Sequence, residues 1–476
     1  MSAPADASAP PCAALFPARA ERARVDDWLT RELLAADERI ARGPVMPTLD
    51  MQRFARELAR YDFREGQPLD TVLAWTLQQL EHGLVHLNHP RYFGLFNPAP
   101  NYPSQCADRI AAVFNPQLAS SGTSPVGVAL EAHVLRAFAQ RAGMPAGSTG
   151  HFTTSGSEAN YTALICALTH ASGRFGSEGV RAFEAPLAIY ASGDCHPGWL
   201  KIAHQCGIGR AALRAIETDA QGRLRAEALA QALARDRAAG VLPVMIVATA
   251  GTSLAGMIDP LAHCGQLARE QRVWYHVDAA WGGAALCSPR LQGLLAGTEL
   301  ADSLSIDAHK WLATTMCCGM FLCAHPQVAS EAFRVTADFM PSTLASVDPY
   351  LNSVQWSRRF LGLRLFLSLA AAGWEGYAAH LERAVALIDA VRERLTTRGW
   401  TVVNDSPLAV LCVRPPAGAP PVREIVRRVL ASQRAWVAAT QLAGQEVVRI
   451  CATHGASTLA DAEAVVQELA SASENG

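Results

Sequence analysis

The first part of the chain has the apolar periodicity of amphipathic helices. Between residues 69 and 84, apolar side chains recur every three or four positions, which is the spacing of one helical face. They are Leu69, Val72, Leu73, Leu77, Leu80 and Leu84. Gly43-Pro44 and Gly66-Gln67-Pro68 interrupt the pattern, as turn residues do. We therefore predict two or three helices over residues 20–85, which lack enough apolar partners among themselves to form a core.

From about residue 125 the pattern changes to helices that alternate with short apolar runs. Residues 225–236 and 261–271 have helical periodicity, and Gly/Ser residues open another helix after His151. The strand-length runs are LAIYAS (187–192), VMIVATA (244–250), VWYHVDAA (273–280), DSLSIDA (302–308) and MFLCA (320–324). Strands that alternate with helices predict an α/β domain with a mostly parallel sheet.

After about residue 360 the predicted order is helix, strand, strand, helix. The two strands are WTVVND (400–405) and LAVLCVR (408–414), with helical segments on both sides. This order predicts a smaller α+β unit. The predicted organisation is a flexible leader (1–20), an N-terminal helical arm (21–95), a large α/β domain (96–360) and a small C-terminal α+β domain (361–476).

Composition narrows the class of protein. The 476 residues carry a formal net charge of −2, which argues against a nucleic-acid partner because such proteins are strongly basic. Half of the residues are hydrophobic and 18% are charged, so disorder is excluded for most of the chain. No apolar run is long enough to cross a membrane, and the first 20 residues do not have the pattern of a signal peptide. The cysteines form no CxxC pair, so we expect a cytoplasmic protein without a metal site.

Polar residues follow several predicted strands, where parallel sheets bind their ligands. Ser155-Gly156-Ser157 opens a helix and suits a phosphate, although serine is also an ordinary N-cap. His196 follows the run 187–192 and is by itself an ordinary loop residue. Asp278 and Lys310 lie in apolar surroundings, where a charge is costly unless it is paired or chemically used.

These four features together indicate one cofactor. Pyridoxal 5'-phosphate needs a lysine for its aldehyde, a carboxylate for its pyridine nitrogen, a phosphate-binding turn and a group over its ring. The chain offers them in the order Ser155-Gly156-Ser157, His196, Asp278 and Lys310.

The motifs that contain these residues resemble those of the group II pyridoxal-phosphate-dependent amino acid decarboxylases, which include aromatic amino acid, glutamate, histidine and diaminobutyrate decarboxylases. The most specific pair is HVDAAWGG (276–283) with SIDAHKWL (305–312). Further similar pieces are HPRYFG (89–94), TTSGSEAN (153–160), GDCHPG (193–198), ATAGTSLAGMIDP (248–260) and QWSRRFLGLRLF (355–366). The resemblance implies fold type I, the aspartate aminotransferase-like fold, with a large seven-stranded, mostly parallel sheet.

The resemblance also implies roles for individual residues. Lys310 is the expected Schiff-base lysine, Asp278 the partner of the pyridine nitrogen, and His196 the group stacked on the ring. The other residues implied to surround the cofactor are Ala280 under the ring, Thr249 beside its substituents, and Ser155, Gly156, Ser157, Ser303 and His309 around the phosphate. The family further implies a homodimer with its active site at the interface and the arm across the partner.

Two positions depart from the family pattern. Phe339 stands where decarboxylases usually have a loop tyrosine that protonates the quinonoid intermediate, and relatives with phenylalanine there produce an aldehyde in an oxygen-dependent reaction. Tyr350 and His196 are alternative proton donors, so decarboxylase and aldehyde synthase both stay open. Asp307 replaces the asparagine of several relatives, and because a carboxylate beside a phosphate is unfavourable, we leave it out of the phosphate set.

The aromatic side chains Tyr92, Phe93 and Phe96 predict an apolar substrate pocket, which favours an aromatic or large apolar L-amino acid. Arg91 is interpreted as a structural arginine, with an acidic substrate as the alternative. A fold type I aminotransferase is the remaining alternative and would use Arg449 for the substrate carboxylate. A dinucleotide oxidoreductase and a serine hydrolase are poorly supported, because GIGRAA (207–212) is not on a clear strand-to-helix turn and no GxSxG is present.

Overall fold

The structure is a computed structural model that describes residues 14–97, 99–335 and 348–474. Its large domain is built on a seven-stranded sheet with the order β1-β7-β6-β5-β4-β2-β3. The strands are β1 (Thr149–Thr153), β2 (Leu187–Ser192), β3 (Leu213–Ile216), β4 (Leu242–Thr249), β5 (Trp274–Asp278), β6 (Ser303–Asp307) and β7 (Gly319–Cys323). Only β7 runs antiparallel to its neighbours β1 and β6, which confirms the predicted mostly parallel α/β sheet.

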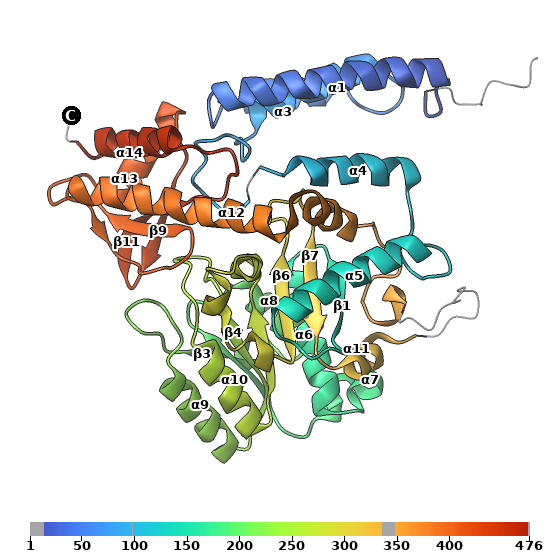
Figure 1. Ribbon diagram of the computed structural model, residues 1–476, viewed down its shortest axis with the longest axis vertical. Helices are drawn as coiled ribbons and strands as arrows, with labels where there is room; N and C mark the ends of the chain where they lie inside the picture. Colours follow the sequence, from blue (N-terminus) through green and yellow to red (C-terminus); the bar gives the residue numbers. More distant parts are fainter. Residues whose placement is uncertain (1–13, 98, 336–347, 475–476) are drawn as a thin grey trace, which may run out of the picture.

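Helices cover both faces of this sheet, as the apolar character of its strands requires. One face packs against α6 (Gly156–Ala171), α8 (Gly198–Gln205) and α11 (Pro326–Phe333). The opposite face packs against α5 (Pro125–Arg141), α9 (Ala226–Ala238) and α10 (Leu261–Gln271). The sheet and these helices form the green and yellow body of the molecule (Figure 1).

The C-terminal domain contains a four-stranded antiparallel sheet with the order β10-β11-β9-β8. Its strands are β8 (Thr401–Val402), β9 (Val410–Arg414), β10 (Ala438–Leu442) and β11 (Gln445–Cys451), and its helices are α13 (Val422–Ser432) and α14 (Leu459–Ser473). The sequence analysis predicted only the first two strands, so the hairpin of β10 and β11 corrects it. A tight turn with positive φ at Ala443 and Gly444 joins the hairpin strands.

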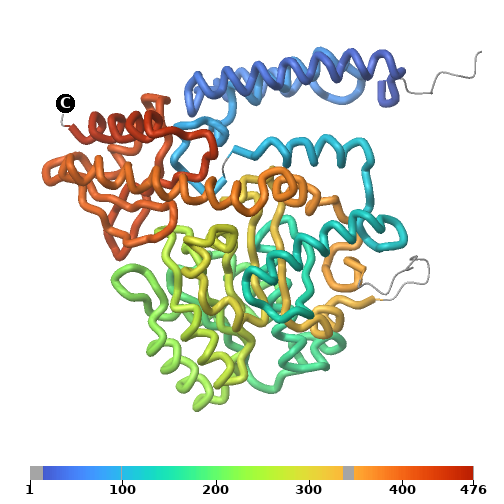
Figure 2. The backbone as a smooth tube through the Cα atoms, viewed as in Figure 1, coloured from blue at the N-terminus to red at the C-terminus, as the bar shows by residue number. Residues whose placement is uncertain are grey.

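The long helix α12 (Gly362–Thr397) connects the two domains. It consists of two helical segments that meet at Gly373, whose φ of 64° lies in a region that glycine adopts readily. The first segment packs against α4 (Tyr102–Phe114). The second segment runs into the C-terminal domain (Figure 2). Among the described residues, no helix has both the length and the apolar character needed to span a lipid bilayer.

The N-terminal arm consists of α1 (Arg19–Arg42), α2 (Met51–Leu58) and α3 (Leu69–Gly83), and none of these helices contains a fully buried residue. The arm lies along the upper side of the molecule in Figure 1, beyond α4 and α12. Ion pairs join α1 to α3, with 2.8 Å between Arg39 and Glu81. The predicted helices and their lack of apolar partners are thus confirmed, while the domain boundaries stay predictions.

A buried ion pair fixes the start of α12 against α5. The guanidinium of Arg358 lies 2.5 Å from the carboxylate of Glu131, and both side chains are at most 4% exposed. Glu131 also accepts a hydrogen bond from the backbone N–H of Gly362 at 2.9 Å. Burial raises the pKa of Glu131, and the positive charge of Arg358 opposes that rise.

Replacing Glu131 with alanine should strongly destabilise the fold, because the Arg358 guanidinium would stay buried without a counter-ion. Removing one partner of a buried pair costs about 3–5 kcal/mol, measurable as a lower denaturant midpoint in equilibrium unfolding. The matched control is Glu424→Ala, which removes an exposed pair with Arg427 and should hardly move the midpoint. An unchanged midpoint in Glu131→Ala would contradict this account, and Glu131→Gln serves if the alanine variant does not fold.

Candidate active site

The predicted site residues gather in a cavity of about 190 Å³ at the carboxyl ends of β4, β5 and β6. Its lining contains most of the residues that the sequence analysis selected. The lining residues are Phe96, Ser155, Gly156, Ser157, Asn160, His196, Thr249, Gly251, Ser253, Asp278, Ala280, Trp281, Asp307, His309 and Lys310. The fold therefore brings together side chains that are up to 214 positions apart, as Phe96 and Lys310 are.

Lys310 lies in the turn that follows β6. Its Nζ is 3.0 Å from Oδ2 of Asp307, and its side chain is 22% exposed. The chain has only two lysines, and the other one, Lys201, is exposed on α8. Lys310 is thus the one lysine of the sequence that lines the cavity, and its partly exposed amine is accessible to a carbonyl group.

Asp278 ends β5 and is 5% exposed. Its Oδ2 accepts hydrogen bonds from Asn160 at 2.7 Å and from the indole N–H of Trp199 at 3.3 Å. Its Oδ1 accepts from the backbone N–H of Ala280 at 3.2 Å. These donors hold the carboxylate in one orientation at the end of β5, where it can face the nitrogen of a bound pyridine ring.

The turn Ser155-Gly156-Ser157 opens α6. The Ser155 side chain makes no capping hydrogen bond, so the plain N-cap interpretation does not account for it. The first N–H groups of a helix have no partner within the helix and carry its positive dipole end, which suits a phosphate. A Cβ on Gly156 would lie 2.9 Å from Asp307 and 3.0 Å from Ala280, so glycine allows this close packing.

His196 lines the cavity from the loop between β2 and α8, and it is exposed. Its Nδ1 accepts a hydrogen bond from the backbone N–H of Gly198 at 3.1 Å. Because one ring nitrogen is an acceptor, the neutral ring carries its proton on Nε2. The ring is therefore held by its own loop at the edge of the cavity.

Three buried polar atoms of the described cavity wall have no hydrogen-bond partner: Oγ1 of Thr249, Oδ1 of Asp307 and Nε1 of Trp281. Buried polar atoms are normally paired, so these three fit a polar ligand such as a pyridine ring with its substituents. Thr249 is held in place because its backbone N–H donates to Asp259 at 2.7 Å. Asp259 accepts a second bond from Leu224, and its burial raises its pKa to about 7.

Asp307 lines the cavity, although the sequence analysis left it out of the phosphate set. Its carboxylate faces Gly156 and pairs with Lys310, and it lies 3.9 Å from Nε2 of His309. His309 is 5% exposed and interacts through Nδ1 with the backbone of Cys318. Asp307 therefore belongs to the wall of the cavity, where Lys310 compensates its charge.

Ser303 lies outside the cavity, which corrects its predicted place beside the phosphate. It begins β6, whereas the cavity lies at the other end of that strand, and its side chain is fully buried. Its Oγ contacts the indole N–H of Trp274 at 2.9 Å and Nδ1 of His276 at 2.8 Å. Ser303 therefore supports the interior behind the site.

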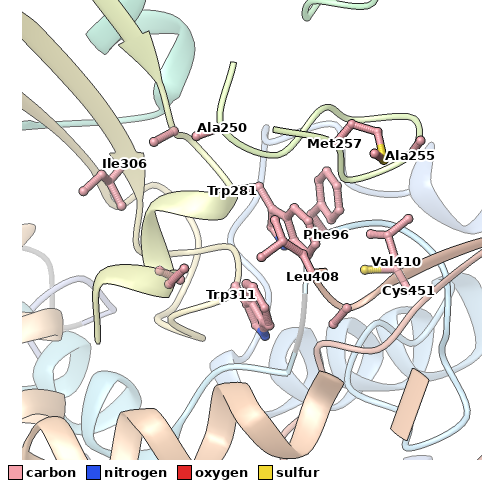
Figure 3. Close-up of a cluster of buried hydrophobic side chains, with 14 of the residues drawn as sticks. Phe96, Ala250, Ala255, Met257, Trp281, Ile306, Trp311, Leu408, Val410 and Cys451 are labelled. Atoms are coloured by element: carbon pink, nitrogen blue, oxygen red, sulfur yellow. The ribbon is translucent and has the colours of Figure 1, made fainter. Parts of the chain in front are cut away.

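Of the three residues predicted to form an aromatic substrate pocket, Phe96 is the one among the cavity's lining residues. Phe96 lines the cavity and stacks on Trp281 with 4.2 Å between ring centroids, as Figure 3 shows. Tyr92 instead stacks on Trp436 of the C-terminal domain at 5.0 Å, and the backbone of Phe93 bonds to Trp436 and Cys451. Both side chains are almost fully buried, so they hold the two domains together.

The candidate substrate arginines are all engaged elsewhere. Arg91 pairs with Asp461 at 3.4 Å, which agrees with its structural interpretation. Arg449 donates to the backbone oxygens of Ser253, Leu254 and Gly94 and lies over the ring of Phe96. An aminotransferase role for Arg449 is therefore unsupported, because its guanidinium already has its partners.

Phe339 lies outside the described residues. Tyr350 is 7% exposed, and its ring lies 5.1 Å from Trp356. Of the three cysteines that follow Lys310 most closely in the sequence, Cys318 and Cys323 are buried and Cys317 is exposed.

The sequence analysis missed three residues that hold Asp278. Asn160 and Trp199 donate to its carboxylate, and His276 contacts Asn160 at 3.0 Å. Asn160 was part of the quoted motif TTSGSEAN and Trp199 follows GDCHPG, but neither carries a charge that marks it. The available signal was the alternation of polar residues in WYHVD and SLSID, which is unusual for a strand buried on both faces.

Comparison with known proteins identifies the family. The model of the pyridoxal-dependent decarboxylase conserved domain matches residues 57–414. The chain is 33% identical over 343 residues to L-2,4-diaminobutyrate decarboxylase of Rhizobium meliloti, a match that covers 69% of this chain and 65% of that protein. It is 26% identical over 433 residues to aromatic-L-amino-acid decarboxylase of Bacillus atrophaeus, covering 87% and 88% of the two chains.

Solved structures agree with the fold. The structure of Oryza sativa TDC with PLP and tryptamine has a TM-score of 0.89 at 24% identity, covering 96% of this chain and 99% of that one. Rhodiola rosea 4-hydroxyphenylacetaldehyde synthase has a TM-score of 0.86 at 23% identity, with the same coverage of both chains. With its matching domain model, its cavity and its fold, this chain belongs to the pyridoxal-dependent decarboxylase family, whose cofactor is pyridoxal 5'-phosphate.

Proposed function

We propose that this chain removes CO2 from an L-amino acid with an aromatic or large apolar side chain and releases the corresponding amine. This substrate class is supported by the stacked rings of Phe96 and Trp281 in the cavity wall. Stacked aromatic rings offer an apolar face to a substrate side chain. The only side chains of the lining residues that can carry a positive charge are Lys310, His196 and His309, so an acidic side chain has no arginine to meet there.

In this proposal each residue has a defined task. When bound, pyridoxal phosphate supplies an aldehyde for the substrate's amino group and a ring that accepts the electron pair left by CO2. Lys310 binds the aldehyde, and Asp278 holds a proton at the pyridine nitrogen. Ser155, Gly156 and Ser157 bind the phosphate at the start of α6, and His196 excludes water from one face of the ring.

The remaining cavity residues orient the cofactor. Thr249 donates its hydroxyl toward the ring substituents, and Ala280 leaves room for the ring on the face opposite His196. Asp307 contacts Nζ of Lys310 at 3.0 Å, which orients this amine within the cavity. His309 packs behind Asp307.

We further propose that the active protein is a homodimer whose arm covers the partner. This is supported by apolar side chains that a lone chain leaves exposed, including Leu34 (61%) on α1 and Val113 (82%) and Phe114 (78%) at the end of α4. Burying such side chains is worth about 1.5–3 kcal/mol each. Their contact with a second copy would also place the arm beside the site.

Replacing Lys310 with alanine should abolish turnover and the visible absorbance of the bound cofactor, because no other lysine lines the cavity. The matched control, Lys201→Ala, should keep both. Borohydride reduction followed by peptide mapping should attach the cofactor to the peptide that contains Lys310. Visible absorbance that survives in Lys310→Ala would exclude this lysine as the attachment point.

A panel of L-amino acids, with CO2 measured for each, tests the substrate class. We expect kcat/KM for phenylalanine, tyrosine or tryptophan to exceed that for glutamate and 2,4-diaminobutyrate at least tenfold. Phe96→Ala should lower kcat/KM for the aromatic substrate up to about tenfold, the value of one lost stacking contact. Phe175→Ala, which removes a phenylalanine on the other side of the sheet, is the control. A preference for glutamate would overturn the proposed substrate class.

The same panel separates two products. An aldehyde is the second candidate, because Phe339 offers no proton at the loop position that the family resemblance singles out. Amine without oxygen consumption is expected for a simple decarboxylase, and stoichiometric peroxide with aldehyde would replace it by an aldehyde synthase. In that case Phe339→Tyr should shift the product toward amine, because the phenol supplies the missing proton.

The dimer is checked by sedimentation of the full chain. We expect a dimer for the native protein and a larger monomer fraction when Val113 and Phe114 are both replaced by serine. An active native monomer would contradict the proposed assembly.

A further inference from the structure

One buried face of two central strands is polar. On β5, Trp274, His276 and Asp278 alternate with Tyr275 and Val277, which belong to the apolar core on the other face. The paired strand β6 repeats the pattern, because Ser303 lies opposite His276 and Ser305 opposite Asp278. All of these residues are at most 5% exposed. Central parallel strands are normally apolar on both faces, so this polar stripe, formed by Trp274, His276, Asp278, Ser303 and Ser305, requires an explanation.

The stripe continues through α6 as an unbroken series of contacts. The indole N–H of Trp274 donates to Oγ of Ser303 at 2.9 Å, and this Oγ is 2.8 Å from Nδ1 of His276. Nε2 of His276 is 3.0 Å from Oδ1 of Asn160. The amide nitrogen of Asn160 donates to Asp278 at 2.7 Å, the shortest contact of the series.

The chemistry of these groups fixes the direction of every hydrogen bond. An ionised Asp278 only accepts, so Asn160 must donate with its amide nitrogen and face His276 with its oxygen. Nε2 of His276 must therefore carry a proton. Burial lowers the pKa of His276 to about 4, so the ring is neutral and Nδ1 accepts from the hydroxyl of Ser303.

The series of hydrogen bonds ends at the indole of Trp274, which can only donate and therefore cannot reverse the direction of the series. Ser303 donates its single hydroxyl proton to His276, so its oxygen accepts from Trp274, and an indole N–H is a donor only. The other groups that face His276 do not compete, since Trp199 meets its ring edge-on at 5.6 Å. Every donor between Trp274 and Asp278 therefore points toward the carboxylate.

We propose that Trp274, Ser303, His276 and Asn160 are positioning residues, which act as a one-way donor chain that fixes the orientation of Asp278. This inference rests on the proposed role of Asp278 at the pyridine nitrogen. Hydrogen bonds in a series polarise one another, so the bond from Asn160 to Asp278 is strengthened and the carboxylate stays turned toward the cavity. If these residues only filled space in the core, apolar residues would do so equally well, and burying them would cost less free energy.

Substitutions at His276 test the chain. In His276→Gln, the amide can still donate to Asn160 and accept from Ser303, whereas His276→Leu can do neither. We expect kcat to fall about tenfold or more in His276→Leu, a typical effect of losing an outer partner of a charged group, with KM nearly unchanged. His276→Gln should recover most of that loss. Ser303→Ala should show a smaller fall, and Ser368→Ala, which removes another buried hydroxyl that does not line the cavity, should show none.

A second readout does not depend on turnover. Nitrogen NMR of the cofactor-free protein with labelled histidine should give one ring, assigned by its absence in His276→Gln, that is protonated on Nε2 and does not titrate between about pH 5.5 and 8.5. In Ser303→Ala this ring should stay protonated on Nε2, because the oxygen of Asn160 still faces it. Melting temperatures of all variants separate loss of folding from loss of positioning.

A His276 ring protonated on Nδ1 alone would overturn the proposal, whatever the enzyme's substrate is. Equal losses of kcat in His276→Gln and His276→Leu would overturn it as well. If His276→Leu does not fold, the kcat of Ser303→Ala and the NMR signal of the His276 ring test the proposal instead. Failure of the proposed function is distinguishable, because it would appear as cofactor absorbance in Lys310→Ala while the tautomer of His276 stayed as described.

Discussion

A carboxylate buried at the end of a central strand is the constraint on which this active site depends. An isolated charge in a protein interior is costly unless donors surround it, and Asp278 receives them from α6 and α8. Asn160 lies one helical turn after Gly156 on α6. The contact that satisfies Asp278 therefore also sets the distance between the ring-binding carboxylate and the phosphate-binding turn.

An aromatic stack fixes the opposite side of the cavity in a similar way. Trp281 lies between Phe96 at 4.2 Å and Trp311 at 5.0 Å. Trp281 follows Asp278 by three residues, and Trp311 follows Lys310 directly. The stack therefore ties both reactive side chains to the segment around Phe96, which also contacts the C-terminal domain through Arg449. Relative movement of the two domains would disturb the lysine and the carboxylate together.

The sequence allowed prediction of the residues whose chemistry is unusual for their place. Asp278 and Lys310 were identifiable because charges at the ends of apolar strands need a reason, and β2, β4, β5, β6 and β7 because long apolar runs mark buried strands. The short strand β3 and the hairpin of β10 and β11 carry weaker patterns. Ser303 was misplaced because a position in sequence near Lys310 does not reveal which end of β6 it occupies. Tyr92 was misplaced because only tertiary packing brings Trp436 against it.

The distribution of charge around the cavity bears on the type of reaction. Arg91, Arg358 and Arg449 are all held by carboxylates or backbone oxygens, and no arginine is found among the described residues that line the cavity. A guanidinium clamp would stabilise the substrate carboxylate before the reaction, but not the neutral CO2 that leaves. Interactions accelerate a step only when they are stronger in the transition state than in the ground state. The cavity wall offers the stacked rings of Phe96 and Trp281 in place of such a clamp, which favours loss of CO2 over retention of the carboxylate.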